Sequence, residues 1–458
     1  MKSILVAVVL RYLRFWGQLT VRIHRPIVIG IAGSLGKSST RNAVHAALKD
    51  SVRVKVVAEN TQTGVPLGLL GIQPSGYSVF HWAWMLLRAP FGLFYLRKTP
   101  YLIVEMGIDG PDEPLNMKYL LRIVKPDIAV SLNITPTHTG LYNDALPTQD
   151  KQLPDAERME KILEMMAHDD TRIVRESGCR VAIVNADDSH IMKQIAEWKA
   201  STKTQDQTVW TFGEDQSNAA SVQSVTHSQA GTDMVIQIEG SKHAVMIPQA
   251  VLPRMYWQNI AVAVLVAKAC GVSVAQAIAG IEAEYRVPKG RASVFVGING
   301  STIIDSSYNA SRAAIVPFLE LLSELASKNN SQRIALIGDM RELGDNSASE
   351  HALLVPDVLK HADRVYCVGE WTKKILVPEL EKQGMQDVQW FESSEALGRF
   401  LHDHLPENAT VLAKGSQNTI FLEEAIKPIL ANPEDRTKLC RQESYWLEIK
   451  QRYFASIN

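Results

Sequence analysis

The residues with the clearest chemistry lie near the start of the chain, where an apolar run, Ile27–Ala32, enters a glycine-rich turn that ends in Gly-Lys-Ser-Ser. A phosphate chain is bound by backbone N–H groups that approach closely, by a lysine, and by a hydroxyl that holds Mg²⁺. Glycine permits the close approach because it has no Cβ. The segment therefore predicts a site for a nucleoside triphosphate, formed by Gly33, Ser34, Gly36, Lys37, Ser38 and Ser39.

The spacing of this phosphate loop is unusual. The common form has a glycine five residues before Gly36, where this sequence has Ile31. The loop is therefore a short variant, G-x-x-G-K-S, and a helical pattern of small and apolar residues follows it over residues 40–48. A glycine turn that precedes an ordinary helix by chance is the alternative, and the strand-turn-helix context favours the phosphate loop.

The composition is that of an ordinary globular protein. The 458 residues, 46% apolar and 21% charged, suffice for two or three domains. A formal net charge of −1 argues against general binding to nucleic acid, and we expect none. The four cysteines are far apart and form no C-x-x-C pair, so neither a zinc site nor a disulfide framework is indicated. We expect a monomer in the reducing cytoplasm.

Charge is uneven along the chain, because no Asp or Glu precedes Asp50 whereas eight Lys and Arg do. Residues 3–23 also have helical periodicity, with one broad apolar face and arginines on another. Arginine interrupts the apolar run too early for a transmembrane helix, and no signal-peptide cleavage site follows. Two interpretations stay open: a peripheral amphipathic helix at the inner face of a membrane, or a helix packed on its domain with its arginines in water.

A second unusual segment, residues 81–98, crowds aromatic and aliphatic side chains between Arg88, Arg97 and Lys98. Aromatic residues are usually buried, so a role in the core is the first expectation. Contact with a membrane or a substrate is the alternative.

Strand-like and helical runs alternate along most of the chain, which predicts an α/β fold. The runs 27–32, 101–106, 127–134 and 181–185 indicate a mostly parallel sheet, residues 208–250 read as antiparallel strands, and a second alternating series begins near residue 290. The predicted organisation is a basic amphipathic segment (1–25), a central P-loop ATPase domain (26–288) and a C-terminal Rossmann-like α/β domain (289–458).

Several further motifs occur in a characteristic order: Asn60-Thr61-Gln62-Thr63-Gly64, Glu105-Met106-Gly107, Asn133-Ile134-Thr135-Pro136-Thr137-His138, Asn185-Ala186-Asp187-Asp188, Tyr308-Asn309-Ala310 and Gly338-Asp339-Met340-Arg341-Glu342-Leu343-Gly344. In these motifs the chain resembles the Mur ligases, and among them the MurF type, over residues 27–430. The resemblance implies ATP-dependent formation of an amide bond through an acyl phosphate, with a dipeptide such as D-Ala-D-Ala or an amino acid added to a cell-wall peptide precursor. The substrate would be a small molecule or peptide, linked to UDP or to a lipid.

The resemblance also implies roles for residues of the central domain. Lys37 would meet the outer phosphates, and Ser38 and Glu105 would hold Mg²⁺. His138 would help to bind a second metal ion, and Lys161 would be a carbamylated, metal-bridging lysine, with Lys151 or no carbamate as alternatives. Other implied roles are the catalytic centre for Asn185, adenine for Asn259, and substrate for Asn60 and Thr61.

In the C-terminal domain the resemblance assigns Arg291, Asp305, Tyr308 and Asn309 to the nucleotide. It assigns Lys414 and Ser416 to the incoming amine and its carboxylate. One departure from the family is Ser306, which stands where other members have a carboxylate directed at the nucleotide.

The second departure is the position of the phosphate loop. MurF-type chains carry an N-terminal domain that holds the UDP part of the substrate, and we expect that domain to be absent here. Its absence keeps two alternatives open: a ligase of the same fold that acts on a poly-amino-acid, folate-type or other envelope carboxylate, and a nucleotide-binding regulatory partner that does not ligate.

Overall fold

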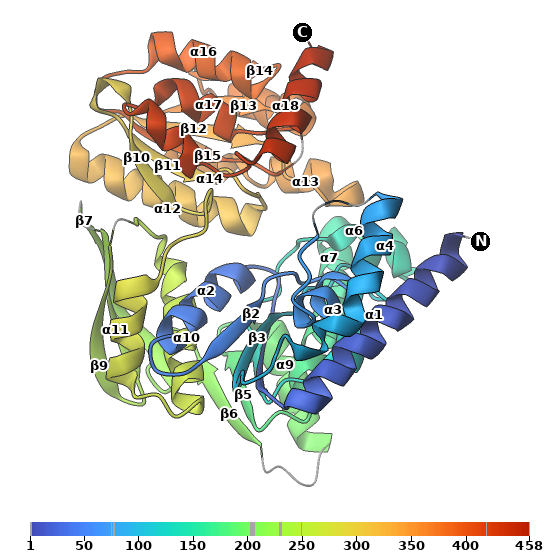
Figure 1. Ribbon diagram of the computed structural model, residues 1–458. Coiled ribbons are helices and arrows are strands. Elements are labelled where there is room, and N and C mark those ends of the chain that lie inside the picture. The colour runs from blue at the N-terminus through green and yellow to red at the C-terminus, as the bar shows by residue number, and fades with distance from the viewer. Residues whose placement is uncertain are drawn as a thin grey trace. The chain divides into compact units, whose positions relative to one another are not determined.

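The computed structural model describes residues 2–74, 76, 78–201, 207–228, 231–248, 250–417 and 419–457 (Figure 1). Their contacts divide the chain into two compact units. Unit 1 comprises Met1–Ser224, Met234–Val245 and Trp257–Arg286, and unit 2 comprises Val225–Asp233, Met246–Tyr256 and Val287–Asn458. Residues 1–25 thus belong to unit 1, and the break near residue 287 lies beside the predicted boundary; the division into three domains stays a prediction.

The larger sheet of the described chain has nine strands, in the order β2-β3-β1-β4-β5-β6-β7-β8-β9. The strands β2 to β7 pair in parallel wherever pairing is described. Their bounds are β1 (Ile27–Ala32), β2 (Val54–Val57), β3 (Tyr101–Glu105), β4 (Ile128–Ser131), β5 (Val181–Asn185), β6 (Thr208–Phe212), β7 (Ala220–Ser228), β8 (Gly231–Ile238) and β9 (Ser241–Pro248).

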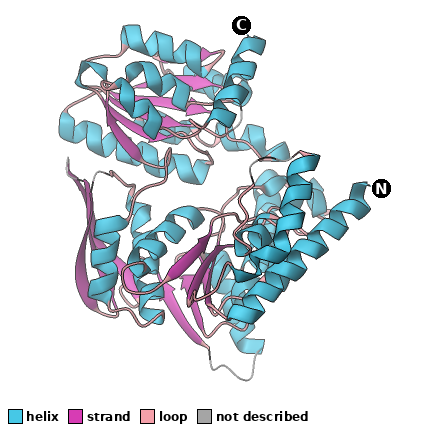
Figure 2. Cartoon of the chain, in the orientation of Figure 1, coloured by secondary structure: helices cyan, strands magenta, loops and turns pink. Residues whose placement is uncertain are grey.

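Helices cover both faces of this sheet because its central strands are apolar on both sides (Figure 2). On one face Val28, Leu102 and Ala182 pack against helices that include α5 (Met117–Ile123), α7 (Asp155–Asp170) and α9 (Ser189–Ser201). The alternate residues of the strands point to the opposite face. There α2 (Lys37–Leu48) lies against α10 (Trp257–Ala269), which is buried along nearly its whole length, and against α11 (Val274–Glu284).

Short helices complete unit 1. They are α3 (Gly64–Leu69), α6 (Thr139–Ala145) and α8 (Arg172–Arg175), together with the 3₁₀ turn η2 (Asp150–Gln152). The 3₁₀ turn η3 (Arg254–Tyr256) belongs to unit 2.

The N-terminal segment forms α1 (Lys2–His24), which packs on unit 1 beside α4 (Val79–Arg88) and the 3₁₀ helix η1 (Ala89–Phe94) (Figure 1). Leu13 is fully buried in a small core with Leu67, Leu70 and Met85. The Tyr12 hydroxyl donates to the Leu86 carbonyl at 3.1 Å, and Thr20 Oγ1 donates to the Leu93 carbonyl at 3.0 Å. Residues 79–94 are therefore helical. The expected core role of segment 81–98 is confirmed for Met85, Ala89 and Leu96, which are buried, and is wrong for Trp84 and Phe91, which are exposed.

Unit 2 contains a six-stranded sheet in the order β10-β11-β15-β12-β13-β14 among the described residues. Only β10 is antiparallel to its neighbour. The strands are β10 (Ser293–Val296), β11 (Thr302–Ser306), β12 (Arg333–Gly338), β13 (Arg364–Val368), β14 (Val388–Phe391) and β15 (Thr410–Lys414). The helices are α12 (Arg312–Asn329), α13 (Ser347–Ala352), α14 (Val355–His361), α15 (Val377–Lys382), α16 (Ser394–His404), α17 (Glu423–Ile426) and α18 (Ser444–Ile457). The short turns are η4 (Ile298–Gly300), η5 (Gly344–Asn346), η6 (Thr372–Leu376), η7 (Lys427–Ile429) and η8 (Pro433–Lys438).

The predicted α/β class is confirmed by the two sheets and their helices. The predicted strand 127–134 is shorter than expected, because β4 ends at Ser131 and the chain then turns toward the phosphate loop. The interpretation of residues 208–250 as antiparallel is wrong for β6, which pairs in parallel with β5 and so extends the main sheet. No helix of the described chain is long and apolar enough to span a membrane.

The two faces of α1 provide a test of its packing. Leu13 is buried, whereas Leu5 on the same helix is 66% exposed. We expect Leu13→Ala to destabilise unit 1 by about 2–5 kcal/mol, because it removes buried methyl groups and leaves a cavity. Leu5→Ala is the matched control and should cost about 0.5 kcal/mol or less. Urea denaturation followed by circular dichroism measures both, and equal effects would mean that α1 is not anchored.

Candidate active site

The phosphate loop joins β1 to α2 at the carboxyl edge of the main sheet. Gly33 and Gly36 have φ values of 136° and 84°, in the region that favours glycine. A Cβ on Gly33 would also lie only 2.8 Å from Leu132 Cβ. The two glycines therefore allow the turn and its close approach to β4. The loop lies between β1 and β4, where the connections of the sheet diverge and open α/β sheets place their ligands.

Asn133, which follows β4, holds the loop in place. Its Oδ1 accepts from the Leu35 N–H at 2.8 Å, its Nδ2 donates to the Leu35 carbonyl at 3.0 Å, and its own carbonyl accepts from the Ser34 N–H at 2.8 Å. Lys37 bends back over the loop, with Nζ donating to the carbonyls of Gly33 and Ser34. Sequence reasoning noted Asn133 within a motif but missed this role.

Glu105, the last residue of β3, accepts hydrogen bonds from three side chains, two of them in α2. Ser38 Oγ lies 3.1 Å from each carboxylate oxygen, Asn60 Nδ2 donates to Oε1 at 3.2 Å, and Arg41 Nη1 donates to Oε2 at 2.8 Å. The parallel register pairs Glu105 with Ile31, just before the loop. The carboxylate is almost fully buried, and these donors satisfy it.

Three predicted residues, Ser38, Asn60 and Glu105, are thus brought together, and Arg41 is an addition that sequence reasoning missed. A signal was present, since Arg41 lies four residues after Lys37 and therefore on the same face of the helix.

Asn259, near the start of α10, lies beside the phosphate loop. Its Oδ1 accepts from Thr40 Oγ1 at 2.9 Å and is 3.1 Å from the position that a Cβ on Gly36 would take. The buried Ser39 lies on the same helix as Thr40. The predicted contact of Asn259 with adenine stays a prediction.

Asn185 and its neighbours brace the adjacent strands. Asn185 Nδ2 donates to the Leu132 carbonyl at 2.7 Å, and Asp188 Oδ2 accepts from the Ile134 N–H at 2.7 Å. Asp170 adds a buried acid that sequence reasoning missed. It accepts from Ser131 Oγ at 2.8 Å, and burial raises the pKa of its carboxyl to about 7. These contacts support the strand ends that carry the loop.

His138 and Lys161 lie apart from the Glu105 cluster in their contacts. His138 precedes α6 with φ 55°, and its Nδ1 lies 3.8 Å from Asp109 Oδ1. Lys161 is half-exposed on α7 and lies 3.6 Å from Glu164 on the same helix. Thr61 Oγ1 accepts from the Gly64 N–H at 3.0 Å, at the start of α3. Their predicted metal, carbamate and substrate roles stay predictions.

The oxygen atoms of Ser38 and Glu105 fit a magnesium ion, because Mg²⁺ in nucleotide sites takes one or two protein oxygens and completes its shell with phosphate and water. No group of three or more His, Cys, Asp or Glu side chains that could hold a metal ion occurs in the described ranges. A metal ion here would therefore depend on the bound phosphates for ligands.

Unit 2 has its own polar edge, where β11, β12, β13 and β15 end. A cavity of about 410 Å³ lies there. It is lined by Asn309, Asp339, Met340, Arg341, Glu342, Ser347, Glu370, Trp371 and Gln417. Asp339 accepts from the N–H groups of Glu370 and Thr372, both at 2.9 Å, so its carboxylate holds the β13 loop. Of the residues that sequence reasoning placed in the site, Asn309 lines this cavity.

Lys414 and Ser416 are buried, and both contact the main chain that follows β11. Lys414 Nζ donates to the carbonyls of Ser306, at 3.2 Å, and Asn309. Ser416 Oγ donates to the Ala310 carbonyl at 3.3 Å. Burial, with the nearby charge of Arg291, lowers the pKa of Lys414 to about 7. Both residues therefore position the loop that carries Asn309, and their direct contact with an amine stays a prediction.

Asp305 and Tyr308 lie on either side of Ser306. Asp305 is buried at the end of β11, and burial raises the pKa of its carboxyl to about 6. Its Oδ1 accepts from the Ser307 N–H at 3.0 Å, while Oδ2 has no hydrogen-bond partner among the described residues. The Arg291 guanidinium lies 4.5 Å from the centre of the Tyr308 ring. Ser306 is buried and offers its carbonyl to Lys414.

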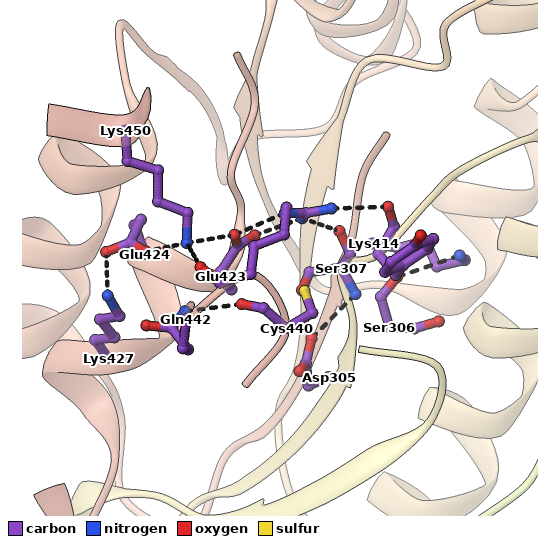
Figure 3. Close-up of polar contacts among 12 residues, drawn as sticks. Asp305, Ser306, Ser307, Lys414, Glu423, Glu424, Lys427, Cys440, Gln442 and Lys450 are labelled. Atoms are coloured by element: carbon purple, nitrogen blue, oxygen red, sulfur yellow. Dashed lines mark hydrogen bonds and ion pairs between the residues drawn. The ribbon is translucent and has the colours of Figure 1, made fainter. Parts of the chain in front are cut away.

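A buried charge network contacts this loop (Figure 3). Arg441 donates to both oxygens of Glu423, at 2.8 and 2.6 Å, and to the carbonyls of Ser307 and Tyr308, at 2.8 and 3.0 Å. Lys450 of α18 lies 2.7 Å from Glu423. Although burial alone raises the pKa of Glu423, the hydrogen bond and charge of Arg441, with the charge of Lys450, hold it below its usual value. Sequence reasoning missed this network, because nothing in the spacing of its members marks it.

Comparison with known proteins agrees with this geometry. The family model "Mur ligase middle domain" matches residues 31–267, and "Mur ligase, glutamate ligase domain" matches residues 290–417. A Rickettsia prowazekii protein named UDP-N-acetylmuramoyl-tripeptide--D-alanyl-D-alanine ligase is 26% identical over 85% of this chain and 75% of its own length.

Two solved structures of proteins named MurF have the same fold. The structure from Acinetobacter baumannii has a TM-score of 0.69 and 22% identity, and covers 90% of this chain and 79% of its own. The structure from Thermotoga maritima, in complex with ADP, has a TM-score of 0.68 and 19% identity, and covers 97% of this chain and 84% of its own.

The two sheets and the phosphate loop define an α/β protein of the P-loop class. Because the two family models together match most of its length, the chain belongs to the Mur ligase family.

The charge network predicts a large effect on stability. Arg441→Met should destabilise unit 2 by about 3–5 kcal/mol, because it leaves the Glu423 carboxylate buried with one partner fewer. The control is Arg452→Met on α18, since Arg452 lies 3.5 Å from Glu448 in an exposed pair and should contribute about 1 kcal/mol or less. Urea denaturation measures both variants. A loss for Arg441→Met no greater than that of the control would show that the network does not hold the loop.

The lowered pKa of Lys414 predicts a dependence of stability on pH. Above about pH 7 the folded protein has lost the Lys414 proton, whereas the unfolded chain keeps it up to the usual pKa of 10.5. Lys414 should therefore make unit 2 more stable as pH rises from about 7 to 8.5, by at most about 1.4 kcal/mol per pH unit. Below pH 7 both states are protonated and the contribution is flat.

Hydrogen exchange of β11 and β15, corrected for the intrinsic rate at each pH, measures this slope. Lys414→Met should reduce it, and Lys382→Met, at an exposed lysine of α15, should not. An unchanged slope in Lys414→Met would contradict the assignment.

Proposed function

We propose that this chain is an ATP-dependent ligase of the MurF type, which joins D-alanyl-D-alanine to a UDP-N-acetylmuramoyl-tripeptide. The observation that carries the proposal is the phosphate loop with the Ser38–Glu105 pair at its end, within a chain that belongs to the Mur ligase family. The name of the Rickettsia relative supplies the substrate pair.

The residues suit a transfer of phosphate to a carboxylate. The substrate carboxylate attacks the γ-phosphorus, the bond to the β-phosphate oxygen breaks, and ADP leaves. The amine then attacks the acyl phosphate, inorganic phosphate leaves, and the nitrogen loses a proton to give the amide. The first step brings anions together, so it needs positioned cations more than an acid or a base. Lys37 supplies one such cation at the outer phosphates.

Ser38 and Glu105 hold Mg²⁺ in this proposal, and the ion would neutralise phosphate charge when bound. Arg41 and Asn60 keep the Glu105 carboxylate oriented, through the contacts of 2.8 and 3.2 Å. Second-metal binding by His138 and carbamylation of Lys161 are further parts of the proposal, as are the nucleotide contacts of Asn259, Arg291 and Tyr308.

The cavity of unit 2 takes the incoming dipeptide. Its volume of about 410 Å³ is in the range of small-ligand pockets. Arg341 offers a cation for the carboxylate of the dipeptide, and the Glu370 carboxylate lies in the same lining for its ammonium group. Lys414 and Ser416 act on this cavity by fixing the loop that presents Asn309.

The proposal also includes a monomeric enzyme of the cytoplasm with peripheral contact to a membrane through residues 3–23 and 81–98. It is supported by the basic N-terminal stretch and by the exposed apolar side chains of both segments.

The test is release of phosphate from ATP in the presence of UDP-muramyl tripeptide and D-alanyl-D-alanine. We expect release that requires both substrates, and Lys37→Ala should lower it by about 10²-fold or more, because the variant loses a preorganised cation at the phosphates. Lys49→Ala, at the C-terminal end of the same helix, where Lys49 pairs with Glu284 at 2.6 Å, is the matched control and should keep full activity.

Each other outcome has a meaning. Release that requires a different carboxylate would replace the acyl substrate while keeping the ligase. Binding of ATP without turnover in any mixture would contradict the ligase and favour a regulatory nucleotide-binding protein.

A further inference from the structure

The first quarter of the chain combines two surface properties that seldom occur together in a soluble enzyme. Residues 1–104 contain thirteen Lys and Arg but only two acidic residues, Asp50 and Glu59. The same stretch carries most of the large apolar side chains that are exposed in the described chain.

The helix α4 has apolar residues on its outward face as well as on its inward one. Met85 and Ala89 are buried against α1 and α3, whereas Phe80, Trp84 and Leu87 are exposed at helical spacing. The following η1 continues the row with Phe91, which is 80% exposed. An outward face of this kind is not explained by packing within the chain.

The exposed side of α1 lies next to this row. Leu5, Val8, Phe15 and Ile23 are each more than half exposed. The two rows are joined by contacts, because Tyr12 bonds to the Leu86 carbonyl and the Phe15 ring lies 5.2 Å from that of Trp16, which packs in the small core with α4. Figure 1 shows α1 and α4 side by side. We call these exposed residues of α1, α4 and η1 the apolar surface.

Basic groups border the apolar surface on both sides. Arg88 and Arg97 lie within or after α4 and η1 and are exposed. Along the neighbouring face of α1 runs a groove of about 630 Å³, whose cations are Arg14, Arg22, Lys118, Arg122 and Lys125. The one acidic side chain in its lining, Glu176, already pairs with Arg172 at 2.8 Å.

The groove and the apolar surface lie on neighbouring faces of one helix. Arg14 precedes Phe15 and Arg22 precedes Ile23, and consecutive residues of a helix point about 100° apart. Arg22 also follows Phe15 by seven residues, so this cation lies beside the apolar surface. An interfacial helix has this arrangement, with apolar side chains at the level of the acyl chains and cations at the level of the lipid phosphates. A partner dissolved in water does not present an apolar layer next to a layer of phosphates.

We propose that unit 1 docks on an anionic lipid bilayer, with the apolar surface entering the interface and the basic groove along α1 taking lipid phosphates. This deepens the membrane contact included in the proposed function and rests on that function only for its purpose, which is to hold the ligase at the membrane surface. No helix of the described residues spans the bilayer, so the attachment is peripheral and reversible.

The experiment is co-sedimentation of the full chain with vesicles of phosphatidylcholine alone and of phosphatidylcholine mixed with phosphatidylglycerol. We expect binding to the anionic vesicles that weakens as salt is raised, and much weaker binding to the neutral ones. Phe80→Ser with Phe91→Ser should lower the partition coefficient about tenfold or more, since each ring buries a large apolar area. Arg14→Glu with Arg22→Glu should lower it by a similar factor on anionic vesicles only.

Matched controls lie on α18 of unit 2. The double variant Tyr445→Ser with Leu447→Ser replaces exposed apolar residues, as the Phe80/Phe91 variant does. Arg452→Glu reverses the charge of an exposed arginine. Both control variants should bind vesicles as well as the unmodified chain does. Circular dichroism confirms that each variant is folded. No binding to either vesicle, or equal losses in test and control variants, would overturn the proposal. Equal binding to neutral and anionic vesicles would overturn the role of the groove.

A second copy of the chain is the competing occupant of the apolar surface. Light scattering after size-exclusion chromatography would detect a dimer. Dissociation of that dimer in the Phe80/Phe91 variant would overturn the proposal that the apolar surface binds a bilayer. The ligase assay with soluble substrates keeps the two proposals distinct. Lys37→Ala should lose phosphate release and keep vesicle binding, whereas the Phe80/Phe91 variant should do the reverse.

Discussion

The buried Glu105 carboxylate is the constraint around which unit 1 is organised. It ends β3 beside the phosphate loop and takes hydrogen bonds from Ser38, Arg41 and Asn60. A buried carboxylate is tolerated only when its oxygens accept hydrogen bonds, so these three side chains are held next to Glu105. Because two of them lie in α2, the helix that follows the phosphate loop is set relative to β3. The loop is held from the opposite side by Asn133, which follows β4.

In unit 2 a larger set of buried charged side chains positions a loop. The carbonyls of the loop after β11 are bound by Arg441 and Lys414. Burying two cations is costly unless they are paired. Glu423 pairs Arg441, while Lys414 relies on carbonyls and on a lowered pKa. The wall of the unit 2 cavity therefore depends on residues outside its lining, and Arg441 lies outside the segment that the family model matches.

Function and surface are separable in this chain. The phosphate loop and the Glu105 cluster lie at the carboxyl edge of the sheet, which their strands fix. The apolar surface is built on α1, α4 and η1, whose inward faces are occupied by Leu13, Met85 and Ala89. Since the same helices have a second apolar face, their periodicity alone left burial and exposure undecided. The exposure of Phe80 and Phe91 shows which of the two apolar faces does not pack within the chain.

The sequence by itself determined the α/β class, the position of the phosphate loop, the strand ends that carry Glu105 and Asn185, and the family. These are local features, since a glycine turn, a strand and a motif depend on neighbouring residues in the chain. Only the tertiary structure decided that Arg41 joins Glu105, that Asn259 lies beside Gly36, and that Arg441 holds the loop 133 residues before it in the chain. It also decided that Lys414 is buried with a lowered pKa, and that Phe80, Trp84 and Phe91 are exposed whereas Met85 and Ala89 are buried. These properties depend on which distant elements pack together, and burial and pairing between distant residues have no local signature in a sequence.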